Sequence, residues 1–292
     1  LSEEHYSMPE TSTTIKSGSI VSPELPIEFI NTGELDIKTT YVLPVTIKSV
    51  EGIGVLQSAK TYYYVFRGAS LINVVCNISR NRAYPDFKND SKFNNLTENT
   101  MEILFKANSF PNTLNTLMGI ESNYLLRIGD ATIPNNQLQV ATSVNNCTSA
   151  DLQLESGKWY HVAVAFNKGN VKVYINGVEK LSGSTGKSSV SLGAKHTNEE
   201  DGSRCFWVGY SYKDDRYFDG VVSEVRIWNR ALTAEEIQAT NHFYTIEPES
   251  EGLIAYWKFD EGSGTVAKDY SVSGYDLTIE KEPKWESVSL PQ

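Results

Sequence analysis

The segment CFWVGYSYKDDRYFDG, residues 205–220, gathers aromatic and charged side chains that together could bind a polar ligand. Aromatic faces can stack on the rings of sugars, and a few polar groups then fix the orientation of the bound molecule. Two of the aromatic residues, Trp207 and Tyr210, could instead be ordinary core and rim residues. The ligand-binding residues that we predict are Trp207, Tyr210, Tyr212, Asp214, Asp215, Arg216 and Tyr217.

The sequence shows no arrangement of side chains that would support catalysis. A glycosidase needs two carboxyl groups across the scissile bond, but Glu224 is the only acid inside VVSEVRIW. We expect Glu224 to be hydrogen-bonded to Arg226 or to a backbone amide. There is also no G-x-S-x-G elbow, no H-E-x-x-H motif and no phosphate-binding Gly loop. His161, one of four histidines, is expected to pack within its strand. We therefore predict no catalytic residues and a protein that is not an enzyme.

The charge and hydropathy of the chain bear on its partners. Its 292 residues carry 26 basic and 36 acidic side chains, a net charge of −10, so a nucleic-acid backbone would be repelled. No apolar run reaches the roughly 18 residues that a membrane helix needs. The start, LSEEHYSMPET, lacks the basic and apolar regions of a signal peptide, so we expect that any export signal has been removed.

The three cysteines suggest no chemistry of their own. Cys76, Cys147 and Cys205 are an odd number without metal-ligand spacing, so at most one disulfide can form within the chain. Isolated buried thiols are the favoured interpretation. A bridge such as Cys147 to Cys205 is the alternative, and the sequence leaves the disulfide state open.

The elements that position these residues are predicted to be β-strands. Sixteen Tyr, 11 Phe and 5 Trp beside 20 Gly and 10 Pro favour many short strands joined by turns, so the fold class is all-β. An N-terminal module contains the strand patterns IEFINTG, TTYVLPVTIKSV and AKTYYYVFRG. A second series begins after a boundary near residues 67–70, which predicts domains at 1–67 and 68–292.

Turn and cap residues fix some of the local structure in the second domain. Lys168-Gly169 and Asn176-Gly177 flank the alternating strand 171–175 and accept the positive φ angles of tight hairpin turns. Thr233 and Glu236 form a capping box at the start of a short helix. We expect this helix to close one end of a β-sandwich.

Three segments of the second domain together resemble the laminin-G-like, concanavalin-type jelly roll. They are SGKWYHVAVAFNKGNVKVYINGVEK, RYFDGVVSEVRIWNRALTAEEI and GLIAYWKFDEGSGTVAKDYSVSGYDLTI, and the resemblance covers roughly residues 68–290. TTYVLPVTIKS followed by TYYYVFRG is similar to the Ig-like module of surface lipoproteins from glycan-degrading Gram-negative bacteria. The implied architecture is a small Ig-like β-sandwich followed by a concanavalin/laminin-G-like jelly-roll sandwich.

The jelly-roll resemblance also implies a cofactor, because laminin-G-like domains often hold a calcium ion. Calcium takes several oxygen ligands from loops, and Asp260 and Asp269 flank the Gly-rich turn EGSGTVAK, where they could converge. The alternative is that these acids only bond nearby backbone amides. One departure from the family is Ser223, where many members carry an acid. This departure weakens any role for paired acids beside Glu224.

The resemblance favours a non-catalytic, cell-surface carbohydrate-binding protein of a glycan-utilisation system. The expected partners are an oligo- or polysaccharide and other cell-surface proteins. The implied location is the bacterial outer-membrane surface, reached through a lipid anchor outside this chain, or the periplasm. A structural or protein-interaction module is the first alternative, since fold does not determine function. A glycoside hydrolase is a less favoured one.

Overall fold

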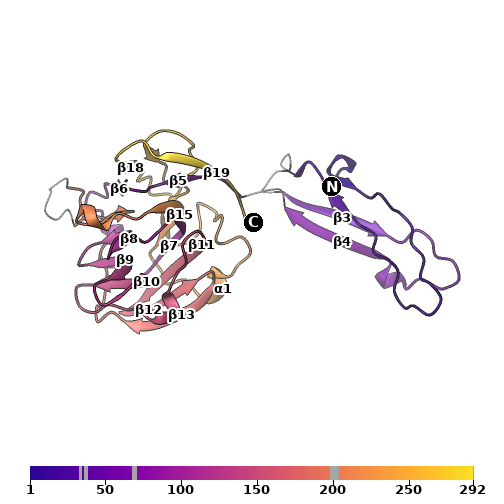
Figure 1. Ribbon diagram of the computed structural model, residues 1–292, viewed down its shortest axis with the longest axis horizontal. Coiled ribbons are helices and arrows are strands. Elements are labelled where there is room, and N and C mark those ends of the chain that lie inside the picture. Colours follow the sequence, from indigo (N-terminus) through magenta and orange to yellow (C-terminus); the bar gives the residue numbers. More distant parts are fainter. Residues whose placement is uncertain (33–34, 36–38, 68–70, 198–203, 292) are drawn as a thin grey trace. The chain divides into compact units, whose positions relative to one another are not determined.

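The computed structural model describes residues 1–32, 35, 39–67, 71–197 and 204–291 (Figure 1). Within it the chain forms two compact units, Leu1–Leu71 and Ile72–Gln292. The predicted boundary falls on residues 68–70, which lie outside the described residues.

The N-terminal unit consists of paired strands and short turns. Its elements are η1 (Glu3–His5), β1 (Tyr6–Ser7), β2 (Glu28–Phe29), β3 (Thr40–Thr46), η3 (Gln57–Ala59) and β4 (Thr61–Arg67). The described residues form two antiparallel pairs, β1 with β2 and β3 with β4, and Pro44 lies opposite Tyr63 in the second pair. The two strands that the patterns TTYVLPVTIKSV and AKTYYYVFRG predict are therefore confirmed.

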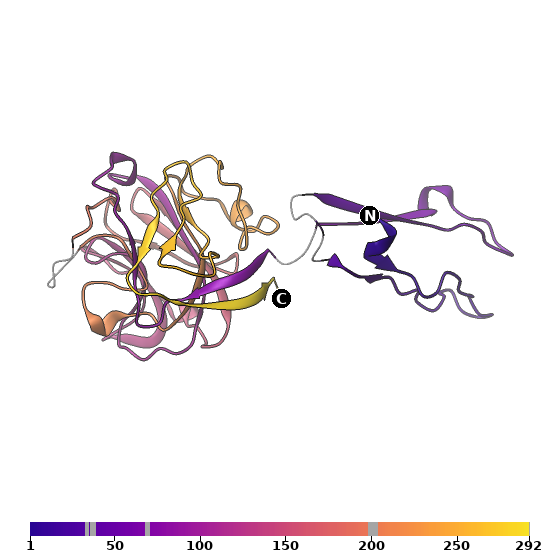
Figure 2. The ribbon, with the colours of Figure 1, turned by 90° about the horizontal axis from the view of Figure 1, so that it is seen from above.

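The second unit is a sandwich of two antiparallel sheets. Among the described residues, one sheet has seven strands in the order β10-β9-β8-β14-β6-β18-β17. The other has eight, in the order β13-β12-β11-β7-β15-β5-β19 with β16 beside β15. Figure 2 shows β19, in yellow, beside β5, so the end of the chain pairs with the start of the unit.

The strands of the sandwich are mostly short, as the turn-rich composition predicts. They are β5 (Ile72–Asn77), β6 (Ala83–Pro85), β7 (Glu98–Ala107), β8 (Asn115–Ile120), β9 (Tyr124–Asp130), β10 (Ile133–Thr142), β11 (Trp159–Asn167), β12 (Asn170–Ile175), β13 (Val178–Ser184), β14 (Trp207–Val208), β15 (Gly220–Trp228), β16 (Leu253–Trp257), β17 (Val266–Ala267), β18 (Leu277–Ile279) and β19 (Lys284–Leu290). The connections contain η4 (Ser91–Phe93), η5 (Ala150–Leu152), η6 (Asp214–Arg216) and α1 (Ala234–Ile237). The all-β fold class is therefore confirmed.

Side-chain alternation divides β11 between two cores. Val162 and Val164 point into the main core between the sheets. Ala163 and Ala165 point to the outer face of the eight-stranded sheet, where a second buried cluster forms. Successive side chains of a strand lie on opposite faces, so one strand can contribute to both clusters.

The predicted hairpins and the capping box are confirmed. Lys168 and Gly169 have φ angles of 46° and 95°, and Asn176 has 48°. The Thr233 side chain accepts from the backbone N–H of Glu236, whose side chain in turn accepts from the Thr233 backbone N–H. The position of α1 differs from our expectation. Instead of closing one end, it inserts Ile237 into the second cluster on the outer sheet face, because that face carries apolar side chains that need a cover.

The three cysteines are buried and none forms a disulfide, which agrees with the interpretation as isolated thiols. Burial raises the pKa of Cys76 far above its ordinary value. Among the described residues no helix has the length and hydrophobicity of a membrane span.

Candidate ligand-binding site

An aromatic patch lies on the outer side of the seven-stranded sheet, around β14. Val208 faces the main core, so its neighbour Trp207 must face outward. There Trp207 meets Tyr84 of β6, with ring centroids 5.2 Å apart, and Tyr210, with centroids 5.1 Å apart. Tyr217 packs against Tyr210, with ring centroids 4.9 Å apart. Four aromatic rings from two strands and one loop thus form one packed cluster on this side of the sheet.

Arg82 joins this patch from the residue before β6. Its guanidinium carbon lies 4.9 Å from the ring centroid of Trp207 and 4.5 Å from that of Tyr210, which is within the range of a cation–π contact. Two of its nitrogens donate to the two carboxylate oxygens of Glu280, at 2.8 and 2.6 Å. No local sequence signal indicates Arg82 or Glu280, because Arg82 lies more than a hundred residues before Trp207 and Glu280 more than seventy residues after it.

A second arginine lies on the loop that carries most of the predicted residues. Arg216 ends η6, donates to Glu121 at 2.8 Å and has its guanidinium carbon 5.3 Å from the ring centroid of Tyr212. Tyr212 has a φ of 61°, in the left-handed region. β14 is only two residues long, and Gly209, which follows it directly, also has a positive φ, of 79°.

The structure brings together only some of the residues that we predicted. Trp207 and Tyr210 are 2% and 5% exposed, so neighbouring side chains cover their faces. Tyr212, Arg216 and Tyr217 are half-buried, and a ligand could reach them. Burial raises the pKa of Tyr217 to about 12, so its phenol keeps its proton and can donate a hydrogen bond at neutral pH.

The two acids of the predicted site lie on η6, and the charge of Asp214 acts on Tyr210 and Tyr217. Asp214 and Asp215 are exposed on η6, and Asp215 approaches the Arg216 Nε atom only to 4.0 Å. At that distance and exposure the ion pair contributes little to stability. Both acids therefore remain available to a ligand, which is what a binding role for them requires.

The predicted metal residues occupy different environments. Asp269 is buried, and its two carboxylate oxygens accept from the backbone amides of Tyr256, Ser271 and Tyr275 at 2.8 to 3.0 Å. Asp260 is exposed and accepts from the Tyr270 hydroxyl at 3.5 Å. Asp269 thus connects β16 to the following turn through hydrogen bonds. The binding of calcium by Asp260 and Asp269 stays a prediction.

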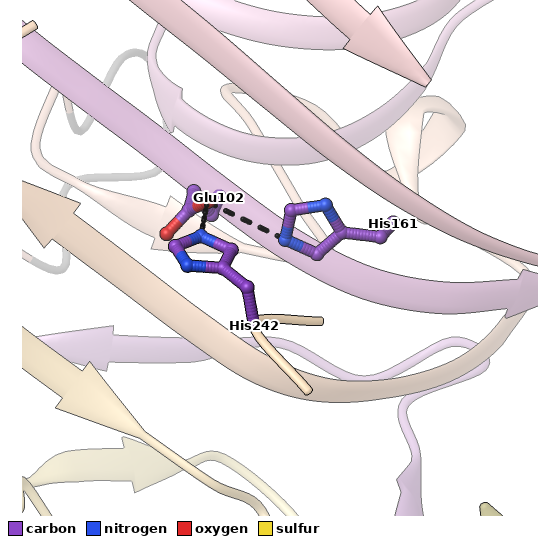
Figure 3. A group of neighbouring side chains, drawn as sticks. All are labelled: Glu102, His161 and His242. Atoms are coloured by element: carbon purple, nitrogen blue, oxygen red, sulfur yellow. Dashed lines mark hydrogen bonds and ion pairs between the residues drawn. The ribbon is translucent and has the colours of Figure 1, made fainter. Parts of the chain in front are cut away.

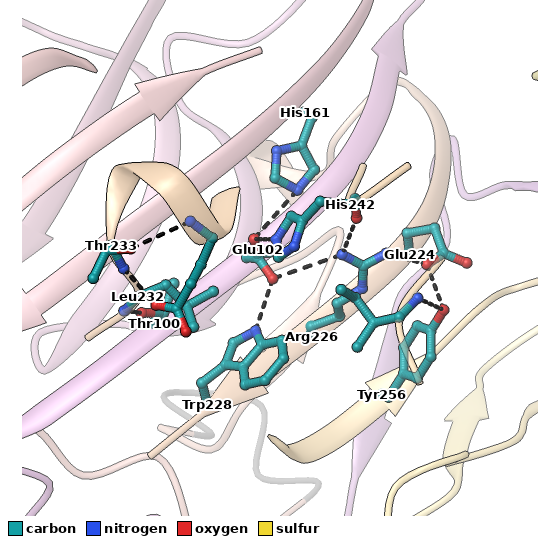
Figure 4. Close-up of polar contacts among 12 residues, drawn as sticks. Thr100, Glu102, His161, Glu224, Arg226, Trp228, Leu232, Thr233, His242 and Tyr256 are labelled. Carbon is teal, nitrogen blue, oxygen red and sulfur yellow. Dashed lines mark hydrogen bonds and ion pairs between the residues drawn. The ribbon is translucent and has the colours of Figure 1, made fainter. Parts of the chain in front are cut away.

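A separate group of charged side chains is buried on the outer face of the eight-stranded sheet (Figure 4). Glu102 of β7 accepts from the indole N–H of Trp228 at 2.7 Å and lies 2.6 Å from His242 Nε2. Arg226 pairs with Glu224, as the sequence predicts, and donates to the backbone carbonyl of His242 at 2.6 Å. We call these five residues the buried polar cluster.

The electrostatics of this cluster are those of buried ions. Burial alone would raise the pKa of Glu102, but the hydrogen bond and charge of His242 outweigh it and lower the pKa to about 2. Burial raises the pKa of Glu224, despite the opposing charge of Arg226. With Glu102 and Glu224 only 0% and 2% exposed, neither can reach a sugar. The cluster therefore does not supply the accessible carboxylate pair of a glycosidase.

Comparison with known proteins relates both units to described families. A family model described as the concanavalin A-like lectin/glucanases superfamily matches residues 81–238, and a model of an N-terminal domain matches residues 1–54. No curated protein matches the chain.

Solved structures include a similar protein over the whole chain. It is a protein from Bacteroides ovatus, provisionally described as carbohydrate binding, which is 25% identical with a TM-score of 0.68, over 99% of this chain and 80% of that one. Domain 4 of an extracellular arabinanase from Geobacillus stearothermophilus, in complex with arabinotriose, is 20% identical over 74% of this chain and 91% of that one, with a TM-score of 0.43. A heptameric pentraxin from Limulus polyphemus is 15% identical over 60% of this chain and 84% of that one, with a TM-score of 0.41.

Proposed function

Because the chain belongs to the concanavalin A-like lectin/glucanases superfamily, we propose that it binds a carbohydrate without cleaving it, as a surface component of a bacterial glycan-utilisation system. The observation that carries the proposal is the similarity of the whole chain to the Bacteroides ovatus protein, whose provisional description is carbohydrate binding. The outer-membrane surface or the periplasm is the location that fits this role.

The half-buried side chains around η6 are the binding site that we propose. Tyr212 and Tyr217 offer aromatic surface, and Arg216 offers guanidinium donors beyond the one that it gives to Glu121. Sugar recognition needs an aromatic face and polar groups that fix orientation, and these residues supply both. Tyr210, which Arg82 and Trp207 hold in place, packs against Tyr217.

The environment of two buried acids supports binding without cleavage. The buried carboxylates of Glu102 and Glu224 are engaged by Trp228, His242 and Arg226, so neither is free to protonate a glycosidic oxygen or to attack a sugar.

Isothermal titration of the protein against a broad panel of oligosaccharides tests this proposal. We expect one sugar class to bind, and Tyr212→Ala to weaken binding by about 1 kcal/mol, roughly fivefold in Kd, through lost stacking. Tyr62→Ala is the matched control, because Tyr62 is an exposed tyrosine of the N-terminal unit. Binding by no member of the panel would contradict the proposal, as would equal losses in the two variants.

A protein-interaction role is the second candidate, and the surface of β4 favours it. Tyr62, Tyr63 and Val65 are more than 60% exposed, and adjacent residues of a strand face opposite sides, so both sides of this strand present apolar surface. Contiguous exposed apolar surface marks interaction sites. Size-exclusion chromatography with the Tyr62→Ser and Val65→Ser double variant tests this role. Self-association lost in the variant would support it, and an unchanged monomer would count against self-association.

A further inference from the structure

His161 lies next to two members of the buried polar cluster, Glu102 and His242, so that one carboxylate and two imidazoles are close together (Figure 3). Glu102 comes from β7, His161 from β11, and His242 from the turn after α1. One ligand atom from each lies within 4.8 Å of the other two. The Glu102 Oε1 atom is 2.6 Å from His242 Nε2 and 3.5 Å from His161 Nε2. Three chain segments thus direct nitrogen and oxygen atoms to one point.

His161 has no satisfactory partner in this arrangement. Its side chain is fully buried, and within the described part of the chain neither ring nitrogen has a hydrogen-bond partner. The 3.5 Å separation from Glu102 exceeds the range of a normal N–H···O hydrogen bond. Buried polar atoms are almost always paired, so an unpaired imidazole points to a bound species that completes it. The Phe243 ring stacks on the His161 ring, with centroids 4.5 Å apart, and holds the imidazole in its orientation toward Glu102.

We propose that Glu102, His161 and His242 bind one divalent transition-metal ion, with zinc as the best fit. Two imidazole nitrogens and one carboxylate oxygen are a common zinc donor set. With ligand bonds of about 2.0 Å and tetrahedral geometry, ligand atoms lie roughly 3.3 Å apart. The two separations from Glu102, 2.6 and 3.5 Å, bracket this value, and all three ligand atoms lie within 4.8 Å of one another.

The surroundings of Glu102 are suited to a ligand. Its second oxygen, Oε2, accepts from the Trp228 indole at 2.7 Å, and such an outer hydrogen bond orients a ligating carboxylate. Arg226 lies 3.7 Å from the same oxygen, but Glu224 neutralises its charge through a direct ion pair. Neither Trp228 nor Arg226 contacts Oε1, the carboxylate oxygen that faces the two histidines, and a cation bound there would replace the hydrogen bond with His242.

The ion would have a structural role. It would join two neighbouring strands, β7 and β11, to the segment after α1, which covers the outer face of the eight-stranded sheet. A ligand that binds only the folded state raises the melting temperature. For this unit, zinc at about 100 times its Kd should raise Tm by roughly 5–10 °C.

Refolding with and without zinc tests the proposal on the intact chain. Because the site is closed to solvent, the protein is unfolded in denaturant and refolded in zinc chloride or in EDTA. The bound zinc is then measured by elemental mass spectrometry and Tm by calorimetry. We expect one zinc per chain and a higher Tm in zinc. No bound zinc, or an unchanged Tm, would overturn the proposal without recourse to any variant.

Two variants separate this site from adventitious binding. His161→Phe removes both ring nitrogens and keeps a ring of similar size against Phe243, so we expect it to fold, to lose the zinc and to show no zinc-dependent Tm shift. His196→Ala is the control, since His196 Nδ1 lies 3.2 Å from Cys205 Sγ and this pair could bind zinc by itself. Zinc lost in His196→Ala and kept in His161→Phe would refute the assignment.

Discussion

Arg226 is the residue whose loss should destabilise the sandwich most clearly. Its side chain is 0% exposed, pairs with Glu224, and lies 3.7 Å from Glu102. It also donates to the His242 carbonyl at 2.6 Å, and its guanidinium carbon lies 5.1 Å from the ring centroid of Tyr256. Replacement by methionine keeps the length of the side chain but leaves Glu224 without its ion-pair partner and removes a positive charge 3.7 Å from Glu102.

The size of the effect follows from the burial of the pair. Removing one partner of a buried ion pair costs about 3–5 kcal/mol, because an uncompensated charge stays in the interior. For a unit of this size each kcal/mol lowers Tm by about 2–4 °C, so Arg226→Met should lower Tm by roughly 6–20 °C. Adding Glu224→Gln to this variant should recover part of the loss, since it removes one of the unpaired charges.

Urea unfolding followed by tryptophan fluorescence measures this effect in the sandwich alone. All five tryptophans lie in the second unit, between Trp159 and Trp285, so the N-terminal unit does not contribute to the signal. Both proteins are measured in EDTA, which keeps metal content equal.

Arg80→Met provides the matched control for the same change of side chain at the surface. Arg80 is exposed, and a surface substitution of this kind changes stability by about 0.5 kcal/mol or less. The reasoning about buried charge would be refuted if Arg226→Met proved no more destabilising than Arg80→Met.

Two further predictions concern carboxylates of the sandwich. Burial would raise the pKa of Asp219, but hydrogen bonds from Ser109 and Ser79 outweigh it and lower the pKa. The contribution of Asp219 is therefore present above its unfolded pKa of about 3.9 and is lost as pH falls through the lower folded value. Asp219→Asn should flatten the decline of the urea midpoint below pH 4, and an unchanged decline would contradict this. Asp269→Asn should lower the free energy of unfolding by about 1–3 kcal/mol with or without calcium, because the carboxylate accepts hydrogen bonds from three backbone amides. A loss of stability seen only when calcium is present would identify Asp269 as a calcium ligand instead.

Local signals explain why much of the fold was predictable from the sequence. The Asn176-Gly177 turn and the Thr233 cap depend on residues within four positions of one another, and both are confirmed. Glu224 and Arg226 are two residues apart, so their pairing was also within reach of a local argument. Strand patterns place the side chains of one strand on alternate faces, and β11 follows that rule.

The candidate sites depend instead on contacts between distant segments. His242 meets Glu102 across 140 residues, and Arg82 meets Trp207 across two strands that only the folded sheet brings together. His161 was expected to pack within its strand, and nothing in its own sequence neighbourhood indicates the two partners that the sheet and the α1 segment supply. Pairing across such separations is set by tertiary packing, which a single sequence does not reveal.

A bulge in β15 explains why the buried polar cluster is separate from the main core. Val222 and Val225 both face the core, although strict alternation would put residues three apart on opposite sides. The register with β7 shifts between Ser223 and Arg226, and Glu224 has a φ of 49°, so one extra residue is accommodated here. If β15 had no bulge, strict alternation from Val222 would direct Arg226 into the main core. The bulge therefore keeps the guanidinium on the outer face, where it pairs with Glu224 and lies 3.7 Å from Glu102, and the positive φ of Glu224 is the conformational cost of that placement.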